Sequence, residues 1–342
     1  MKNFRLKNAG NTVVILVIAL AFYGLVKVGS STGMLNDYWQ RVLDQALITT
    51  IGALGLSIIY GFTGQFSLGH AAFYGLGAYT AGVISKVWGH GDAGYLVLAM
   101  VAGTLMAAVV SLLVGLPILR LRSDYLGIAT LGFGIIVKVA MDNSNKVFAP
   151  LGGATGMTGV PQVINFDLIF VFAVLAILLV RNFITSSYGR ACVTIREDEI
   201  AADVMGIDTT RYKVMAFALG CALAGFAGTL YAHRYPYLHP TSFDWLKAFD
   251  FLLIVVLGGL GSMSGTIATA VSWVFLLEGL RIVLGEAFVD YRGVIYALIL
   301  IITILLRPQG LFSGKELKIL VPSQASRKAA SREEGSHARL GG

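Results

Sequence analysis

Long apolar runs constrain the fold of this chain more than any other feature of its sequence. Most of them contain roughly 17 to 25 residues, the length that an α-helix needs to cross the hydrocarbon core of a bilayer. The bilayer core offers no water to backbone N–H and C=O groups, so each crossing is predicted to be helical. The sequence therefore predicts an all-α, polytopic membrane protein with about ten transmembrane helices. The apolar runs lie at residues 12–28, 42–62, 68–85, 95–119, 125–141, 166–180, 214–232, 245–260, 266–284 and 293–306.

Composition supports a single membrane domain over a pair of soluble ones. The 342 residues are 56 % hydrophobic and 13 % charged, whereas a soluble domain carries roughly 25 % charged residues. The net charge of +7 raises the question of nucleic acid, but the basic residues sit in short loops and tails and form no stripe. The expected surrounding is a lipid bilayer, with no nucleic-acid partner.

Basic residues predict the orientation in the membrane. Lys and Arg gather in alternate loops, and such loops stay in the cytosol. Both the N and C termini are therefore predicted to be cytosolic. The first apolar run resembles a signal sequence, but no small-residue cleavage site follows it, so an uncleaved first helix is expected. The predicted cytosolic basic residues are Lys2, Arg5, Lys7, Arg120, Arg122, Arg181, Arg190, Arg196, Arg211, Lys213 and those from Arg307 onward, against Arg41, Lys86, Lys146, Arg234 and Arg292 outside.

The chain divides into a transmembrane domain and a tail. Residues 1–314 form the predicted transmembrane domain, with a cytosolic loop at about 181–213. Residues 315–342 are basic and lack apolar periodicity, so this C-terminal tail is predicted to be disordered. The apolar runs at 68–85 and 245–260 are short or broken by glycine, and both are candidates for broken or re-entrant segments.

One stretch of the cytosolic loop, residues 196–207, has the pattern of a short amphipathic helix. Acidic residues at 197–199 suit the positive end of a helix dipole, and Gly206 suits the helix end. Ile200 and Val204 stand four residues apart and share one face. Two interpretations remain open: the helix packs on its own membrane domain, or it docks on a partner, where the small Ala201 and Ala202 permit close approach.

A second stretch, residues 61–79, interrupts an apolar run with glycines and polar side chains. Broken helices at membrane depth persist where they are buried in protein or line a cavity. This makes the stretch the leading candidate for a translocation pathway; the alternative is close helix packing through small residues. An isolated histidine such as His70 is more often a hydrogen-bonded structural group than a proton carrier. The candidate pathway residues are Gly64, Gln65, Ser67, Gly69, His70 and Tyr79.

Motifs of nucleotide-binding proteins and enzymes are missing. The Gly314-Lys315 pair lacks the upstream glycine loop of a Walker A motif, and the glycines at 258–261 end an apolar run and open no βαβ unit. The sequence has no His-Glu-x-x-His and no Gly-x-Ser-x-Gly motif. Cys192 and Cys221 have no metal-ligand spacing. We therefore predict no catalytic residue, no metal site and no cofactor bound by this chain.

Two pairs of opposite charge lie within predicted membrane helices. Lys247 and Asp250 stand three residues apart, as do Glu278 and Arg281. Residues at this spacing share a helix face and neutralise one another in part. Both pairs are interpreted as structural, and the alternative is a role in the translocation pathway.

Several segments together resemble one known family. The chain is similar to the LivM-type permease subunits of ABC importers for branched-chain amino acids, over about residues 42–312. Each segment is weak evidence alone, but the combination is specific. The segments are residues 61–82, 121–134, 152–161, 187–206 and 307–312.

The resemblance implies a multi-pass permease of the bacterial inner membrane that moves leucine, isoleucine and valine. Its implied partners are a second similar permease, two ABC ATPase subunits that use ATP and Mg, and a periplasmic or lipid-anchored solute-binding protein. Glu199, Ala201, Ala202 and Gly206 match the family's coupling helix. Permeases for urea, short amides or other amino acids share these motifs, and a stand-alone channel or ion-coupled transporter remains the alternative of a different class.

Overall fold

The computed structural model describes a helical bundle in residues 2–33, 35–89, 92–119, 123–285, 287–307 and 310–311. The α-helices are α1 (Lys2–Ser31), α2 (Asp37–Leu56), α3 (His70–Ile84), α4 (Ala93–Ile118), α5 (Ser123–Asp142), α6 (Phe166–Thr185), α7 (Ser187–Glu197), α8 (Glu199–Val204), α9 (Thr209–Arg234), α10 (Trp245–Gly258), α11 (Met263–Leu284) and α12 (Ala287–Leu306). Two π-helical segments, η1 (Ser57–Phe62) and η2 (Ser85–Gly89), extend α2 and α3. Short 3₁₀ turns are η3 (Ser144–Lys146), η4 (Ala149–Leu151), η5 (Gly153–Thr155) and η6 (Pro240–Phe243). The predicted tail at 315–342 lies outside the described residues.

The all-α membrane fold is confirmed, and a helix stands at each of the ten predicted apolar runs. In the described part of the chain, seven helices are long and apolar enough to cross a membrane. The other three runs form shorter apolar helices: α3 has 15 residues, α10 has 14, and α12 has its apolar part at Tyr291–Thr303. The spanning segments are Thr12–Ser31, Asp37–Phe62, Gly94–Ile118, Tyr125–Asp142, Phe166–Thr185, Thr209–Arg234 and Met263–Leu284.

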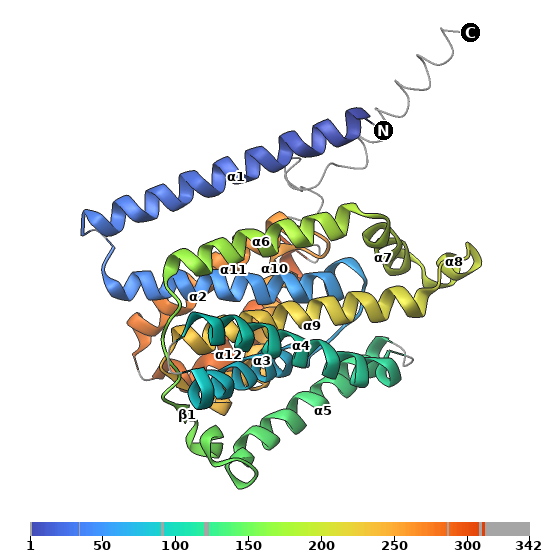
Figure 1. Ribbon diagram of the computed structural model, residues 1–342. Coiled ribbons are helices and arrows are strands. Elements are labelled where there is room, and N and C mark those ends of the chain that lie inside the picture. Colours follow the sequence, from blue (N-terminus) through green and yellow to red (C-terminus); the bar gives the residue numbers. More distant parts are fainter. Residues whose placement is uncertain are drawn as a thin grey trace, which may run out of the picture.

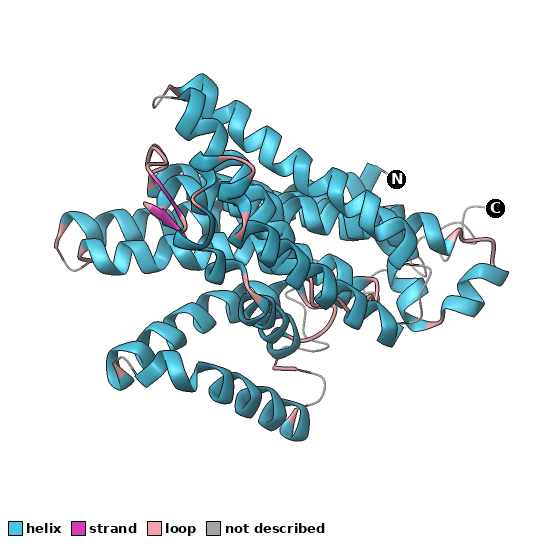
Figure 2. Cartoon of the chain, turned by 90° about the horizontal axis from the view of Figure 1, so that it is seen from below, coloured by secondary structure: helices cyan, strands magenta, loops and turns pink. Residues whose placement is uncertain are grey.

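A small antiparallel ribbon interrupts the helical architecture. Strand β1 (Met157–Thr158) pairs with β2 (Tyr237–Leu238). Figure 2 shows the two strands at one end of the helical bundle. The predicted outer loop thus folds onto the segment that follows α9.

Helix α9 forms the centre of the bundle and packs against α2, α3 and α4. Helix α1 lies along the outside and runs antiparallel to α6 (Figure 1), where Tyr23 stacks on Phe166. A large apolar core joins these central helices and includes the buried Phe73, Phe217 and Phe251. The outer helices leave many apolar side chains exposed, as expected for a surface that faces lipid or another membrane protein.

Small residues bring the central helices into contact. A Cβ atom on Gly220 of α9 would lie 2.5 Å from the carbonyl oxygen of Gly55 in α2. A Cβ atom on Gly228 would lie 1.9 Å from the carbonyl oxygen of Tyr74 in α3. Membrane helices lack a hydrophobic drive to associate, so close backbone approach supplies much of their packing energy.

We expect Gly228→Ala to destabilise the bundle, because its methyl group has no room beside the Tyr74 carbonyl. The free energy of unfolding should fall by about 1–3 kcal/mol, the usual cost of overpacking. Thermal denaturation in detergent measures the effect. Gly132→Ala in α5 is the matched control, since a Cβ there meets nothing within 4 Å. Equal melting temperatures for the two variants would contradict this packing.

Candidate functional site

The segment that joins α6 to α9 lies at one end of the bundle (Figure 1), the same end at which α1 begins. It forms two helices, α7 and α8, where the sequence predicts one helix over 196–207. The chain is extended at Asp198, with φ of −158°, and this residue separates the two helices. The Asp198 side chain accepts a hydrogen bond from the Ala201 amide at 3.0 Å. Arg196 and Glu197 therefore end α7, and Asp198 caps the start of α8.

Helix α8 presents an apolar surface away from the bundle. Ile200 is 79 % exposed, Val204 is 82 % exposed and the adjacent Met205 is 79 % exposed. Ala202 is fully buried. Of the two interpretations left open, the close approach of Ala202 to a partner does not fit this burial, because Ala202 packs within its own chain. The side chains open to a partner are the three larger apolar ones, of which the sequence pattern indicated Ile200 and Val204.

Arg196 connects this segment to a break in the α2–α3 region. Its Nη1 donates a hydrogen bond to the carbonyl oxygen of Gly61 at 2.6 Å. Gly61 lies in η1, where the helix is about to end, so its carbonyl has no partner one turn further along. At the break itself Gly64 has a φ of +76°, and a Cβ there would lie 3.0 Å from Cγ of Arg196. Glycine at 64 thus permits both the turn and the contact.

The same arginine reaches a second break, between α10 and α11. Gly261 has a φ of +81°, and a Cβ there would lie 2.3 Å from Nη1 of Arg196. The two breaks also meet directly, because a Cβ on Gly61 would lie 3.2 Å from the Gly261 nitrogen. Arg196 therefore packs where two interrupted helices come together.

A second connection passes through the first turns of α9. Glu199 of α8 forms an ion pair with Lys213 at 2.5 Å. The carbonyl oxygen of Lys213 accepts a hydrogen bond from Nε2 of Gln65 at 3.1 Å. A continuous chain of contacts thus links α8, the start of α9 and the break before α3.

The six predicted pathway residues are distributed along the bundle. Gly64 and Gln65 lie beside the α7–α9 end, and Gly69 packs against the backbone of Thr130 in α5. His70 is buried, and its Nε2 lies 2.8 Å from the carbonyl oxygen of Gly52. Buried polar atoms of Gln65, Ser67 and His70 have no hydrogen-bond partner in the described structure. The pathway role of these residues stays a prediction.

Tyr79, the sixth of these residues, lies far along α3 from the break. Its hydroxyl group donates a hydrogen bond to the carbonyl oxygen of Leu238 at 3.3 Å, beside the small β-ribbon. None of the six lines the two cavities described next.

A polar cavity of about 830 Å³ opens at the opposite end of the bundle from α7–α8. We call it the outer cavity, because it lies at the end of the bundle that the basic residues predict to face outward. It was not predicted, because its walls come from residues far apart in sequence: the first half of α2, the residue after α9, the start of α10 and α12, and the second half of α11. The lining residues are Tyr38, Arg41, Val42, Gln45, Thr49, Tyr235, Lys247, Asp250, Trp273, Val274, Leu277, Glu278, Arg281, Gly285 and Arg292.

The two predicted charge pairs are both present and both line the outer cavity. Lys247 lies 3.4 Å from Asp250, and Arg281 lies 3.3 Å from Glu278. The spacing in the sequence identified each pair. Their shared cavity depends on the packing of α10 against α11, which no local pattern reveals.

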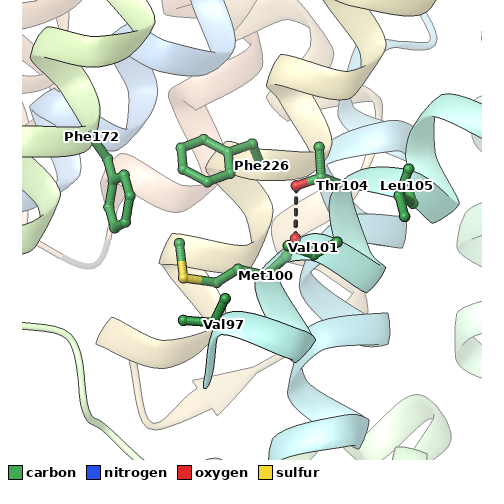
Figure 3. Close-up of a pocket in the computed structure, with 7 residues that line it drawn as sticks. All are labelled: Val97, Met100, Val101, Thr104, Leu105, Phe172 and Phe226. Carbon is green, nitrogen blue, oxygen red and sulfur yellow. Dashed lines mark hydrogen bonds between the residues drawn. The ribbon is translucent and has the colours of Figure 1, made fainter. Parts of the chain in front are cut away.

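A second cavity, of about 360 Å³, is apolar (Figure 3). Its walls are contributed by α4, α6 and α9, with Met100, Phe172 and Phe226 among the lining residues. The hydroxyl group of Thr104 is turned to the Met100 carbonyl oxygen at 2.8 Å. The walls therefore offer no free polar group to a solute. Within the described residues, no group of three or more His, Cys, Asp or Glu side chains could hold a metal ion.

The fold is that of a multi-pass membrane protein, and comparison with known proteins identifies its family. Residues 38–304 match the family described as "Branched-chain amino acid transport system / permease component". This chain belongs to that family. No solved structure matches the chain.

Two kinds of curated relative are similar to it. The high-affinity branched-chain amino acid transport system permease protein LivM of Salmonella typhimurium is 32 % identical over 333 residues, which cover 87 % of this chain and 73 % of the relative. LivM of Escherichia coli K12 has the same identity and coverage. The permease protein LivH of Escherichia coli K12 is 27 % identical over 289 residues, covering 78 % of this chain and 91 % of the relative.

We expect Arg196→Gln to loosen the α7–α8 segment, because the charge-assisted hydrogen bond to Gly61 is lost. A bond of this kind contributes about 1.5 kcal/mol or more, so hydrogen exchange of the α7 amides should accelerate about tenfold. Hydrogen–deuterium exchange measured by mass spectrometry gives this rate. Arg190→Gln is the control, since Arg190 lies on the same helix but bonds locally to Thr185 and Ser187. Equal exchange in both variants would show that Arg196 does not anchor the helix.

Proposed function

We propose that this chain is a permease subunit of an ABC importer that carries branched-chain amino acids across the bacterial inner membrane. One observation supports coupling to a separate ATPase more than any other: a projecting apolar helix is tied by Arg196 to two helix breaks. A helix that only packed on its own domain would not leave Ile200, Val204 and Met205 exposed. Membership of the permease family supports the transport role.

Coupling in this proposal is mechanical. The apolar surface of α8 inserts into a groove of an ATPase subunit, as amphipathic helices do in other complexes. ATP and Mg bind to that partner and not to this chain. When the ATPase subunits close, α7–α8 shifts, and Arg196 and the Glu199–Lys213 pair carry the shift to Gly61 and Gly261. In this scheme Glu199, Ala201, Ala202 and Gly206 shape and anchor the coupling helix.

The proposed assembly contains two permeases, two ATPase subunits and a periplasmic or lipid-anchored binding protein. Similarity to relatives named LivM and to others named LivH supports pairing with a second permease of the same family. The end that carries α7–α8 faces the cytosol in this scheme, in agreement with the basic residues around it. The outer cavity then faces the binding protein.

The proposed solutes are leucine, isoleucine and valine. The printed names of the relatives support them. Uptake assays with the cognate binding protein distinguish these solutes from urea, short amides and other amino acids. ATP-independent solute flux through the purified chain alone would favour a channel or ion-coupled transporter.

We expect Val204→Glu to weaken binding of the ATPase subunit and ATP-driven leucine uptake together. A carboxylate buried in an apolar contact without a partner costs several kcal/mol, so both should fall about tenfold or more. Copurification of the ATPase and uptake into proteoliposomes measure the two effects. Val147→Glu is the control, because Val147 is 89 % exposed and lies on the loop at the other end of the bundle. Normal copurification and uptake with Val204→Glu would refute the docking surface.

A further inference from the structure

The outer cavity lies where a solute delivered from outside would first meet this chain, if the proposed function holds. Helix α9 has 26 residues and runs from the α8 end to Arg234, a distance of about 39 Å at 1.5 Å per residue. Tyr235, which follows it, lines the outer cavity. Gln45 and Thr49 line the cavity from the third and fourth turns of α2, so the cavity extends into the bundle. Its volume of about 830 Å³ falls in the range of small-molecule sites.

Positive charge exceeds negative charge in the cavity walls. The lining includes four basic side chains and two carboxylates: Arg41, Lys247, Arg281 and Arg292 against Asp250 and Glu278. Charges inside a membrane domain are costly and commonly mark the path of a polar solute. A structural network would tend to balance its charges, whereas this one does not.

Asp250 already has three polar partners among its neighbours. Its carboxylate accepts hydrogen bonds from Trp273 Nε1 at 3.1 Å and Arg292 Nη2 at 2.8 Å, and it lies 3.4 Å from Lys247. The side chain is buried. Asp250 therefore fixes the positions of two cations and has little capacity left for a ligand.

Two of the basic side chains, those of Lys247 and Arg41, retain N–H donors that are free to bind a ligand. The Lys247 ammonium group has three N–H donors and makes one long hydrogen bond, to Asp250. Arg41 forms no ion pair or side-chain hydrogen bond with another described residue. Together they offer charge-assisted hydrogen bonds to an incoming carboxylate.

The rest of the cavity suits the other parts of an aliphatic amino acid. Glu278 accepts hydrogen bonds from Tyr38 and Arg281, and a carboxylate has about four acceptor sites, so it can also receive an ammonium group. Val42, Val274 and Leu277 give the cavity an apolar wall. One cavity thus holds basic side chains with unused donors, a carboxylate and an aliphatic surface.

We propose that the outer cavity is a solute site that binds a zwitterionic α-amino acid with an aliphatic side chain. The amino acid's carboxylate binds Arg41 and Lys247, its ammonium group binds Glu278, and its side chain packs on the apolar wall. The site rests on the proposed function for the identity of its solute. It adds to that function a place within the permease where the released solute is held.

Cysteine labelling tests this site in the assembled complex. Gln45→Cys places a thiol in the cavity wall, and a water-soluble methanethiosulfonate reagent labels it. The native Cys192 and Cys221 are buried, and burial raises the pKa of the Cys192 thiol, so both react slowly. Millimolar leucine should slow labelling of Gln45→Cys at least about threefold by occupying the site. Val147→Cys, outside the cavity, should label at the same rate with and without leucine.

Two further comparisons make the test specific. Leucinamide lacks the carboxylate and should give no protection. Arg41→Gln should raise the leucine concentration needed for half-protection about tenfold, because a charge-assisted hydrogen bond is lost. Leucine without effect, or leucinamide as effective as leucine, would overturn the proposal. Thr49→Cys, in the same wall, replaces Gln45→Cys if the latter fails to assemble.

Vesicles that contain the assembled complex allow the site to be tested separately from the function on which it rests. ATP-driven leucine uptake without protection of the cavity thiol would reject the site and leave the importer intact. Protection by leucine without any ATP-driven uptake would retain the site and reject the importer.

Discussion

A helix that stops inside a membrane protein leaves backbone carbonyl groups without partners, and the structure depends on how this chain satisfies them. The carbonyl oxygen of Gly61 lies at such a stop and accepts its hydrogen bond from Arg196, a residue of the segment outside the membrane. Because a buried carbonyl group without a partner costs about 1–3 kcal/mol, this bond ties α7 to the bundle. One side chain therefore completes a broken helix and also ties to the bundle the segment that we propose couples to an ATPase.

Close helix packing makes that connection rigid. Gly220 and Gly228 let α9 touch the backbones of α2 and α3, so the helices on both sides of the first break are held by the same central helix. The breaks at Gly64 and Gly261 are flanked by buried helices and lie against each other through Arg196. In the proposed mechanism, a displacement of α7 reaches both breaks while the centre of the bundle stays packed. A fixed centre with movable breaks is what an alternating pathway requires.

Much of this fold follows from local sequence. Apolar runs located the ten helices, and the acidic residues before Ile200 indicated a helix in the cytosolic loop. The features that the sequence did not reveal depend on contacts between distant segments. Asp198 divides the predicted helix by capping α8, and Ala202 turns inward because α8 lies on α9. Arg196 was seen only as a basic residue of the cytosolic side. Its partners, Gly61 and Gly261, are brought together by the fold. The outer cavity was missed for the same reason, since Arg41 and Lys247 are about 200 residues apart.

The central claim is that Arg196 transmits movement from the coupling helix to the two breaks. The most direct test is the number of leucine molecules imported per ATP hydrolysed by the reconstituted complex. For Arg196→Gln the account predicts that ATP hydrolysis continues while this ratio falls about tenfold, the effect of losing one charge-assisted hydrogen bond. The Arg190→Gln complex should keep the normal ratio. An unchanged ratio in Arg196→Gln would contradict the account and leave Arg196 as a packing residue.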